Sequence, residues 1–278
     1  MQSWSQLTRH IRAGLILLTL ALTADTALST PAWKAEISST KRGHHPSIAS
    51  STLDFTLSWK GIVKAGNLRM EFAPKGVNKP GVFVAKCSAS SLGIAATLFP
   101  FTHSSWSEID PATLVSRYFH ATESDSKENV ITINRYSANS VNVREVTTDL
   151  VTGKINTDLS SFSHGPARDV LSAILYIRSQ KLELGEEHAL LLLPFRTPYL
   201  LKVKVEAKEK HLDRDTLRIS FSLRKIDRTT QTLGPYKKLK KPVTLWLSDD
   251  ADRIPIELRA SAYIGDVRAV LNNFSKIP

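Results

Sequence analysis

Apolar and polar residues alternate along most of the chain from residue 53 onward. The run at Leu53, Phe55 and Leu57 has polar residues between its apolar ones, and residues 201–207 and 217–223 repeat the pattern. A strand with one buried face and one solvated face requires this period of two. The alternation predicts roughly ten strands, in residues 53–60, 68–72, 81–89, 114–121, 128–136, 141–148, 201–210, 216–224, 243–248, 254–263 and 267–274.

One segment instead shows helical spacing. Val170, Ile174 and Ile177 recur three to four residues apart, Asp169 stands near the start of the segment and Arg178 near its end. An acidic residue at the N-terminus and a basic one at the C-terminus of a helix both offset its dipole. The pattern predicts one amphipathic helix over about residues 168–180.

Turn signals separate these elements. Residues 74–81 are expected to form a loop, Asn139-Ser140 a turn, and the polar stretch 153–163 a break in the alternation. Many strands, short turns and a single helix favour a mostly β fold over alternating βαβ units. We expect an antiparallel sheet curled into an open or partial barrel, with a sandwich as the alternative.

The N-terminal 29 residues have the pattern of a secretory signal peptide. Arg9 and Arg12 precede an apolar run at residues 13–22, which is too short to cross about 30 Å of hydrocarbon as a helix. Cleavage is expected between Ala24 and Ser29; an amphipathic or buried helix is the alternative. No cysteine lies near the cleavage region, so we expect a periplasmic or secreted protein without a lipid anchor or transmembrane segment.

The remaining chain divides in two. Residues 30–52 are rich in Ser, Thr, Lys and His and are expected to be a flexible leader, and residues 53–278 to form a single β-rich domain. The one cysteine, Cys87, cannot form an internal disulfide and is expected to be a buried, inert thiol.

The chain is strongly basic. Its net charge is +11, and removal of the signal peptide lowers this only to +10. A basic surface favours lipid head groups, lipopolysaccharide or acidic glycans, and export argues against nucleic acid. If the two strands at 201–210 and 216–224 pair, the basic side chains on them should share one face, and the segment 236–241 adds lysines with apolar residues between them. The alternative is a solvated sheet face. The candidate binding residues are Lys202, Lys204, Lys208, Lys210, Arg218, Arg224, Lys237, Lys238, Lys240 and Lys241.

The densest acidic cluster is the segment 248–253, which contains Asp249, Asp250 and Asp252. Three carboxylates could bind a divalent cation or act as an acid and base pair. The simpler interpretation is a turn between two strands, in which Asp side chains accept hydrogen bonds from local amides. Neither a His-Glu-x-x-His pattern nor a Gly-x-Ser-x-Gly elbow occurs, so no catalytic residue, metal or cofactor is predicted.

Three polar residues of the predicted helix could line a site: Asp169, Tyr176 and Arg178. The simpler interpretation makes Asp169 and Arg178 capping and dipole residues, and Tyr176 a partly buried ring with a solvated hydroxyl group.

Four segments spread along the chain carry a resemblance when they are taken together. They lie at 59–66, 169–185, 246–255 and 264–271, and their order and spacing over residues 53–274 resemble those of an exported bacterial family, domain of unknown function 3108. The resemblance implies a secreted, β-rich domain and supplies no activity. Its residues are Trp59, Gly61, Gly66, Asp169, Tyr176, Arg178, Gly185, Trp246, Asp249, Asp250, Arg253, Pro255 and Gly265.

These observations lead to three functional hypotheses. The first is a periplasmic binding or envelope-assembly factor, whose concave apolar face holds a lipid or another hydrophobic ligand. The second is a surface module that binds acidic glycan or anionic membrane through basic residues. The third is a hydrolase that uses the acidic segment 248–253.

Overall fold

The computed structural model describes residues 30–38, 41–45, 49–73, 81–237, 239–262 and 265–276. The predicted signal peptide with its cleavage site, the expected loop at 74–80 and Lys238 lie outside these residues.

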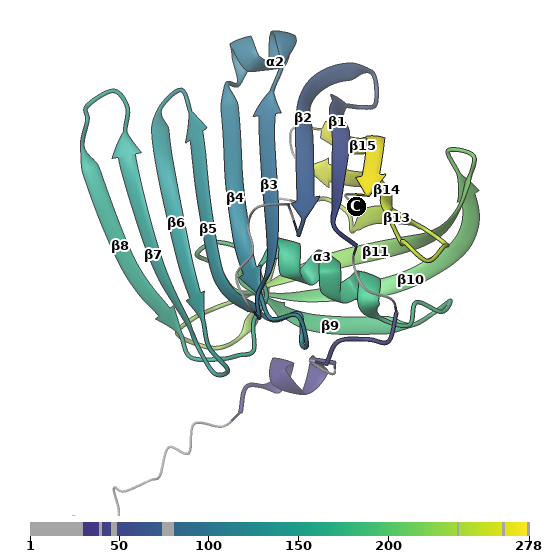
Figure 1. Ribbon diagram of the computed structural model, residues 1–278. Helices are drawn as coiled ribbons and strands as arrows, with labels where there is room; N and C mark the ends of the chain where they lie inside the picture. The colour runs from purple at the N-terminus through teal and green to yellow at the C-terminus, as the bar shows by residue number, and fades with distance from the viewer. Residues whose placement is uncertain are drawn as a thin grey trace, which may run out of the picture.

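The mostly β prediction is confirmed, because one antiparallel sheet of fifteen strands curls around a helix without closing (Figure 1). The strands of the first half are β1 (Ser51–Trp59), β2 (Val63–Phe72), β3 (Phe83–Ser91), β4 (Phe101–Ile109), β5 (Ser116–Asp125), β6 (Glu128–Tyr136), β7 (Val141–Asp149) and β8 (Ile155–Phe162). Those of the second half are β9 (Glu187–Leu192), β10 (Tyr199–His211), β11 (Arg214–Ile226), β12 (Leu233–Pro235), β13 (Val243–Ser248), β14 (Pro255–Ala262) and β15 (Gly265–Lys276). The helices are η1 (Ala32–Glu36), α2 (Gly93–Leu98) and α3 (Val170–Ser179).

The strand order brings the first and last strands together in the middle of the sheet. β1 to β8 follow one another outward in one direction, and β9 to β15 return from the opposite edge until β15 pairs with β1. β12 lies off this path and pairs only with β11. The edges β8 and β9 are joined in sequence by α3, which lies inside the curve (Figure 1).

Several elements differ from the sequence prediction. Residues 153–163 do not break the sheet, because they contain β8, an edge strand with only Phe162 buried. β4 was missed because serine and threonine dilute its alternation, and α2 because a six-residue helix with no buried residue shows no periodicity. Solvated elements carry little hydrophobic pattern, which explains the omission of β8 and α2. The prediction also omitted β9, a short apolar run without alternation, and the three-residue β12.

The predicted helix is confirmed as α3, with Asp169 as its N-cap: a side-chain oxygen accepts from Ser172 N at 3.0 Å. The burial of α3 differs from that predicted for an amphipathic helix, because its own side chains are buried on nearly every side of the helix. The curled sheet covers faces that a surface helix would expose. Its buried residues are Leu171, Ser172, Ala173, Leu175, Tyr176, Ile177, Arg178 and Ser179.

Two apolar cores hold the sheet together. The larger one surrounds α3 and takes side chains from the concave face of strands in both halves. The smaller one lies beside the edges β8 and β9 and includes Trp33, Phe162 and Leu191. Trp33 of η1 is only 2% exposed, and Ser38 N donates to Ala189 O at 2.9 Å, so this part of the expected flexible leader packs on the domain. A single buried tryptophan outweighs the polar composition around it.

Candidate functional site

An apolar cavity of about 220 Å³ lies between α3 and the concave face of the sheet. Its walls come from β1, β2, α3, β11 and β13–β15, so it joins the two halves of the chain. Every lining residue is apolar except Arg178. They are Phe55, Leu57, Leu68, Met70, Ile174, Ile177, Arg178, Phe221, Leu245, Leu247, Pro255, Leu258, Val267 and Ala269.

A second apolar pocket of about 430 Å³ lies at the end of the sheet where β1 turns into β2. Trp59, Ala95 and Phe99 line it, and it shares Val267 with the inner cavity. Val267 pairs with Trp59 at this end of the sheet, so the two pockets adjoin there, and we call this end the mouth.

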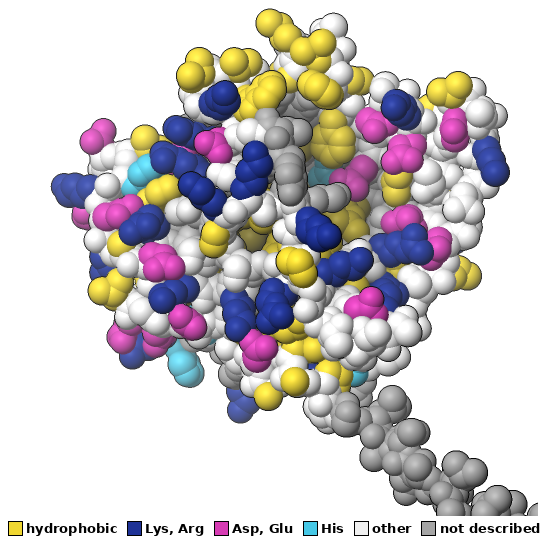
Figure 2. Space-filling model, turned by 180° about the vertical axis from the view of Figure 1, so that it is seen from behind, with side chains coloured by type: hydrophobic (Ala, Val, Ile, Leu, Met, Phe, Trp, Pro, Cys, Tyr) yellow, Lys and Arg dark blue, Asp and Glu magenta, His cyan; other side chains and the backbone are white. Residues whose placement is uncertain are grey.

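The mouth carries exposed apolar side chains that the sequence analysis did not single out. Ile62 is 84% exposed, Ile94 73% and Phe99 69%, and Val63 and Leu98 join them. Figure 2 shows apolar side chains gathered at the top of the molecule, where Figure 1 places α2. Individually exposed apolar residues are ordinary, but a contiguous group of this kind marks an interaction surface.

Arg178 lies at the opposite end of the inner cavity, in the last turn of α3. Its side chain is buried, and the guanidinium group lies 5.5 Å from the centre of the Phe72 ring. Its Nη2 donates to the carbonyl oxygen of Asp252 at 2.7 Å. Arg178 was expected either to line a site or, more simply, to offset the helix dipole, and the structure directs its side chain into the interior.

The acidic segment 248–253 is a turn between β13 and β14. Asp250 Oδ1 accepts from Ser248 Oγ at 2.7 Å and from the amides of Asp252 and Arg253 at 2.9 and 3.0 Å. Burial alone would raise the pKa of Asp250, but these donors outweigh it and lower the pKa. Asp249 pairs with Lys208 at 3.1 Å and Asp252 with Lys276 at 2.8 Å.

The three carboxylates therefore have separate partners, and this geometry corresponds to the turn interpretation. Within the described residues, no three His, Cys, Asp or Glu side chains are grouped closely enough to hold a metal ion.

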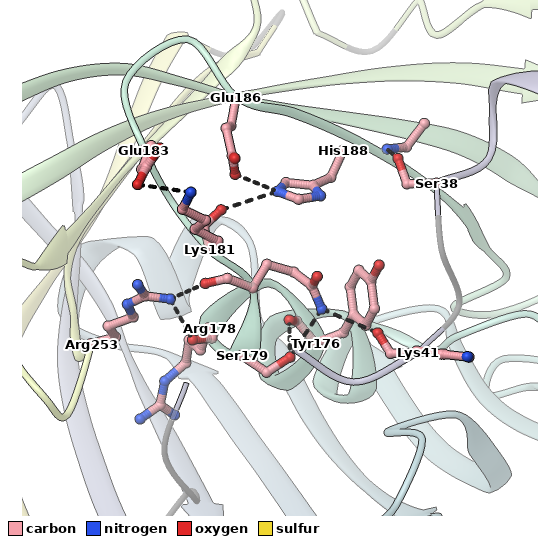
Figure 3. A network of polar contacts seen from close by, with 12 residues as sticks. Ser38, Lys41, Tyr176, Arg178, Ser179, Lys181, Glu183, Glu186, His188 and Arg253 are labelled. Atoms are coloured by element: carbon pink, nitrogen blue, oxygen red, sulfur yellow. Dashed lines mark hydrogen bonds and ion pairs between the residues drawn. The ribbon is translucent and has the colours of Figure 1, made fainter. Parts of the chain in front are cut away.

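Arg253 ties this turn to the end of α3. Its Nη1 donates to the carbonyl oxygen of Arg178 at 3.0 Å and to that of Gln180 (Figure 3). The exchange is reciprocal, because the Arg178 side chain binds the turn at Asp252 while Arg253 binds the carbonyl of Arg178. Two residues of the family-like motif thus fix the C-terminus of α3 against β14, whose first residue is Pro255.

The N-terminal end of α3 is held by a buried polar network. Asp169 accepts from Ser107 Oγ at 2.5 Å, and its own amide donates to Ser116 Oγ at 2.8 Å. Burial raises the pKa of Asp169 in spite of these donors. Tyr176 is only 2% exposed, which corrects the expectation of a partly solvated ring, and the Arg168 guanidinium lies 4.1 Å from its ring centre.

The remaining motif residues shape the backbone. Gly265 has a φ of +113°, and an added Cβ would lie 2.3 Å from the indole Nε1 of Trp59. At Gly66 a Cβ would lie 2.4 Å from the carbonyl oxygen of Ser90 on β3. Both glycines permit close approach at the mouth of the sheet. Gly61 and Gly185 occupy turns.

Trp246 lies under a charged cluster on the convex face. The ring of His211 stacks on the Trp246 ring with 4.2 Å between their centres, and the Arg259 guanidinium lies 4.8 Å from the Trp246 ring centre. The indole Nε1 of Trp246 donates to Glu209 at 2.8 Å. Glu257, buried beside it, accepts from His211 at 2.7 Å. Each polar side chain of this cluster contacts another member, so the cluster connects β10, β13 and β14.

The predicted basic face is divided by a bulge. β10 and β11 pair as expected, but their register shifts between Val205 and Ala207. Past this shift Lys208 pairs with Leu217, an interior residue, whereas Lys202 and Lys204 lie opposite Ser222 and Ser220. A shift of one residue exchanges the two faces of a strand, so Lys208 and Lys210 do not share the face of Lys202 and Lys204.

Several of these basic residues are also paired with acids or carbonyls. Lys202 contacts Glu36, Lys204 contacts Glu187 at 3.4 Å, and Arg218 contacts Glu209 at 3.3 Å. Arg224 donates to the carbonyl oxygen of Leu233 at 3.3 Å. These contacts reduce the positive field expected from the six residues of β10 and β11.

The lysine segment after β12 lies near the mouth. Lys240 N donates to Ser261 O at 2.8 Å, and Ser261 pairs with Asp266 at the turn that begins β15. Lys237, Lys240 and Lys241 are exposed there. Cys87, on β3, is half-buried against the main core, and burial raises the pKa of its thiol to about 12, as expected of an inert residue.

Residues 54–272 match the model of the family described as protein of unknown function (DUF3108). The chain belongs to this family. The match covers the whole curled sheet from β1 to β15, and it confirms the resemblance carried by the four sequence segments.

Two solved structures resemble the chain. One is a β-barrel-like protein of domain of unknown function DUF1849 from Brucella abortus, with a TM-score of 0.53, 10% identity, and coverage of 84% of this chain and 99% of the other. This likeness shows the fold alone. The other has a YmcC-like fold and comes from Bacteroides fragilis, with a TM-score of 0.29, 5% identity, and coverage of 84% and 100%. A search among curated proteins found no match. No helix in the described part of the chain is long and apolar enough to cross a membrane.

Proposed function

We propose that this protein is exported to the periplasm and binds the hydrophobic chain of a lipid in the inner cavity. The observation that carries the proposal is the cavity itself, which is apolar on every wall except at Arg178. At about 220 Å³ it is larger than the dry apolar cavities of about 150 Å³ that bind benzene. The mouth pocket, which is also apolar, adjoins the cavity at Val267.

The first test is native mass spectrometry, with organic extraction, of the protein purified from a bacterial periplasm. We expect an N-terminus produced by cleavage between Ala24 and Ser29 and a stoichiometric lipid that survives moderate salt. Recovery of the unprocessed chain would contradict export, and a ligand-free mass would count against lipid binding.

A cavity-filling variant locates the ligand. Ile174 lines the cavity, whereas Val170 lies on the same helix with its side chain 39% exposed. We expect Ile174→Phe to weaken binding of a fluorescent fatty-chain probe at least tenfold and Val170→Phe to leave it unchanged. Because overpacking costs about 1–3 kcal/mol, the thermal transition of each variant is measured alongside. Unchanged binding by folded Ile174→Phe would exclude this cavity.

We also propose that the mouth contacts the surface of an anionic phospholipid bilayer. Apolar side chains of α2 and the β1–β2 turn lie beside Lys60 and Lys64, and the exposed Lys240, whose amide donates to Ser261, lies near the neighbouring β14–β15 turn. Exposed apolar groups flanked by lysines suit a membrane interface, where each lysine contributes about 1 kcal/mol with anionic lipid. A soluble acidic glycan would leave the apolar groups without a partner.

Vesicle sedimentation tests the bilayer proposal. We expect binding to vesicles that contain anionic lipid, at least fivefold weaker binding for Leu98→Asp, and no change for the matched control Leu159→Asp on β8, whose side chain is also exposed. Equal loss in both variants would point to charge alone. Binding to heparin but not to vesicles would favour the acidic-glycan alternative.

A further inference from the structure

The guanidinium group of Arg178 is incompletely satisfied by the described part of the chain. Nη2 has the carbonyl of Asp252, but Nε and Nη1 are buried without a hydrogen-bond partner among the described residues. None of the ion pairs within those residues joins Arg178 to a carboxylate. The side chain is 6% exposed and lines the inner cavity.

This arrangement is costly for a protein that has no ligand. A buried charge loses its hydration, and Arg178 regains only part of it, because Asp252 and Asp250 act on it as nearby charges without an ion-pair contact. Burial lowers the pKa of Arg178 to about 10, so the group still carries its charge at neutral pH. A trapped water needs two to four polar partners, and the cavity wall provides only this one side chain.

The backbone around Arg178 is held firmly. Arg253 binds the carbonyl oxygens of Arg178 and Gln180, and Asp250 fixes the turn from which Arg253 extends. Figure 3 shows the side chain of Arg178 pointing away from the contacts that its own carbonyl makes with Arg253. The guanidinium group is therefore positioned at the inner end of the cavity by contacts that leave two of its donors unused.

We propose that Arg178 binds the anionic head of an amphiphile, a carboxylate or a phosphate, whose single hydrocarbon chain fills the cavity toward the mouth. The proposal rests on the proposed function and names its ligand class. Charge-assisted hydrogen bonds from an arginine to such oxygens are among the strongest in proteins. The head group would supply acceptor oxygens for Nε and Nη1, which have none among the described residues, and a negative charge in direct contact with the guanidinium group.

The test compares ligands of one chain length in the delipidated protein by calorimetry. The probes are dodecanoate, dodecyl phosphate and dodecanol, which share the chain and differ at the head. We expect at least one anionic probe to bind at least tenfold more tightly than dodecanol, and the tighter of the two identifies the head group. Equal affinity for all three would overturn the role of Arg178 and leave the apolar cavity as the binding site. Failure of all three to bind would overturn the proposed function as well.

The variants Arg178→Met and Arg178→Lys separate charge from shape. We expect Arg178→Met to bind all three probes with equal affinity, close to the affinity of the parent protein for dodecanol. Arg178→Lys should keep part of the preference for the anionic probes over dodecanol. Retention of the full preference by folded Arg178→Met would overturn the proposal. If Arg178→Met does not fold, the comparison of probes in the parent protein and in Arg178→Lys decides the question in its place.

Discussion

The two ends of α3 both carry buried charged side chains, but the protein supplies these side chains with hydrogen-bond partners to different degrees. At the N-terminal end Asp169 accepts from Ser107 and Ser172, and Arg168 donates to the carbonyl of Thr113 at 3.1 Å and covers Tyr176. At the C-terminal end Arg178 lines the apolar cavity and has one carbonyl partner, and its Nε and Nη1 have no hydrogen-bond partner among the described residues. The comparison separates polar groups that stabilise the fold from one that we propose binds a ligand.

The largest effect should come from the N-terminal end. We expect Asp169→Ala to lower the free energy of unfolding by about 3 kcal/mol, because it removes a helix cap and leaves buried donors unsatisfied. Urea denaturation measures the loss, and Asp169→Asn, which keeps an acceptor for Ser172, should lose less. A loss below about 1 kcal/mol would mean that this end is no more structural than the other.

A smaller loss is expected for Arg168→Met at the same end. Methionine keeps most of the packing but removes the hydrogen bond to Thr113 and the contact with the Tyr176 ring, for a loss of about 2 kcal/mol. The same denaturation series provides the value. If Arg168→Met were as stable as the parent protein, the buried arginine at the N-terminal end would not differ from Arg178.

The smallest effect on stability is expected for Arg178→Met. The variant loses one hydrogen bond to Asp252 but also removes a buried charge that has no ion-pair contact, so the free energy of unfolding should change by no more than about 1 kcal/mol. Denaturation of the delipidated protein measures it, since bound ligand would stabilise the parent alone. A loss equal to that of Arg168→Met would assign Arg178 to the structure of the fold.

Much of the fold follows from local pattern. Period-two alternation predicts most of the long strands, and the spacing of Val170, Ile174 and Ile177 with a preceding Asp169 predicts α3 and its cap. The pattern fails where one-sided burial is absent. β8 is exposed, α2 is a short solvated helix, and η1 is fixed by the single buried residue Trp33.

The candidate site was less accessible to sequence reasoning. Arg178 stood at the expected end of a helix, and spacing alone favoured a surface dipole residue over a buried one. The six basic residues on two strands predicted one face, and the bulge between Val205 and Ala207 divided them. The exposed apolar mouth could have been predicted from the sequence, because residues 92–101 include several large apolar side chains and no charged residue.

Local sequence therefore specifies strands, a capped helix and a family, because these depend on backbone geometry and on which side of an element is apolar. The cavity, the burial of Arg178 and the pairing of β15 with β1 depend on segments more than a hundred residues apart. Contacts between residues so far apart in the sequence produce no hydrophobic periodicity from which they could be predicted. The curvature of the sheet determines which groups pack around a charged side chain, and therefore whether it contacts water, a backbone carbonyl or apolar side chains.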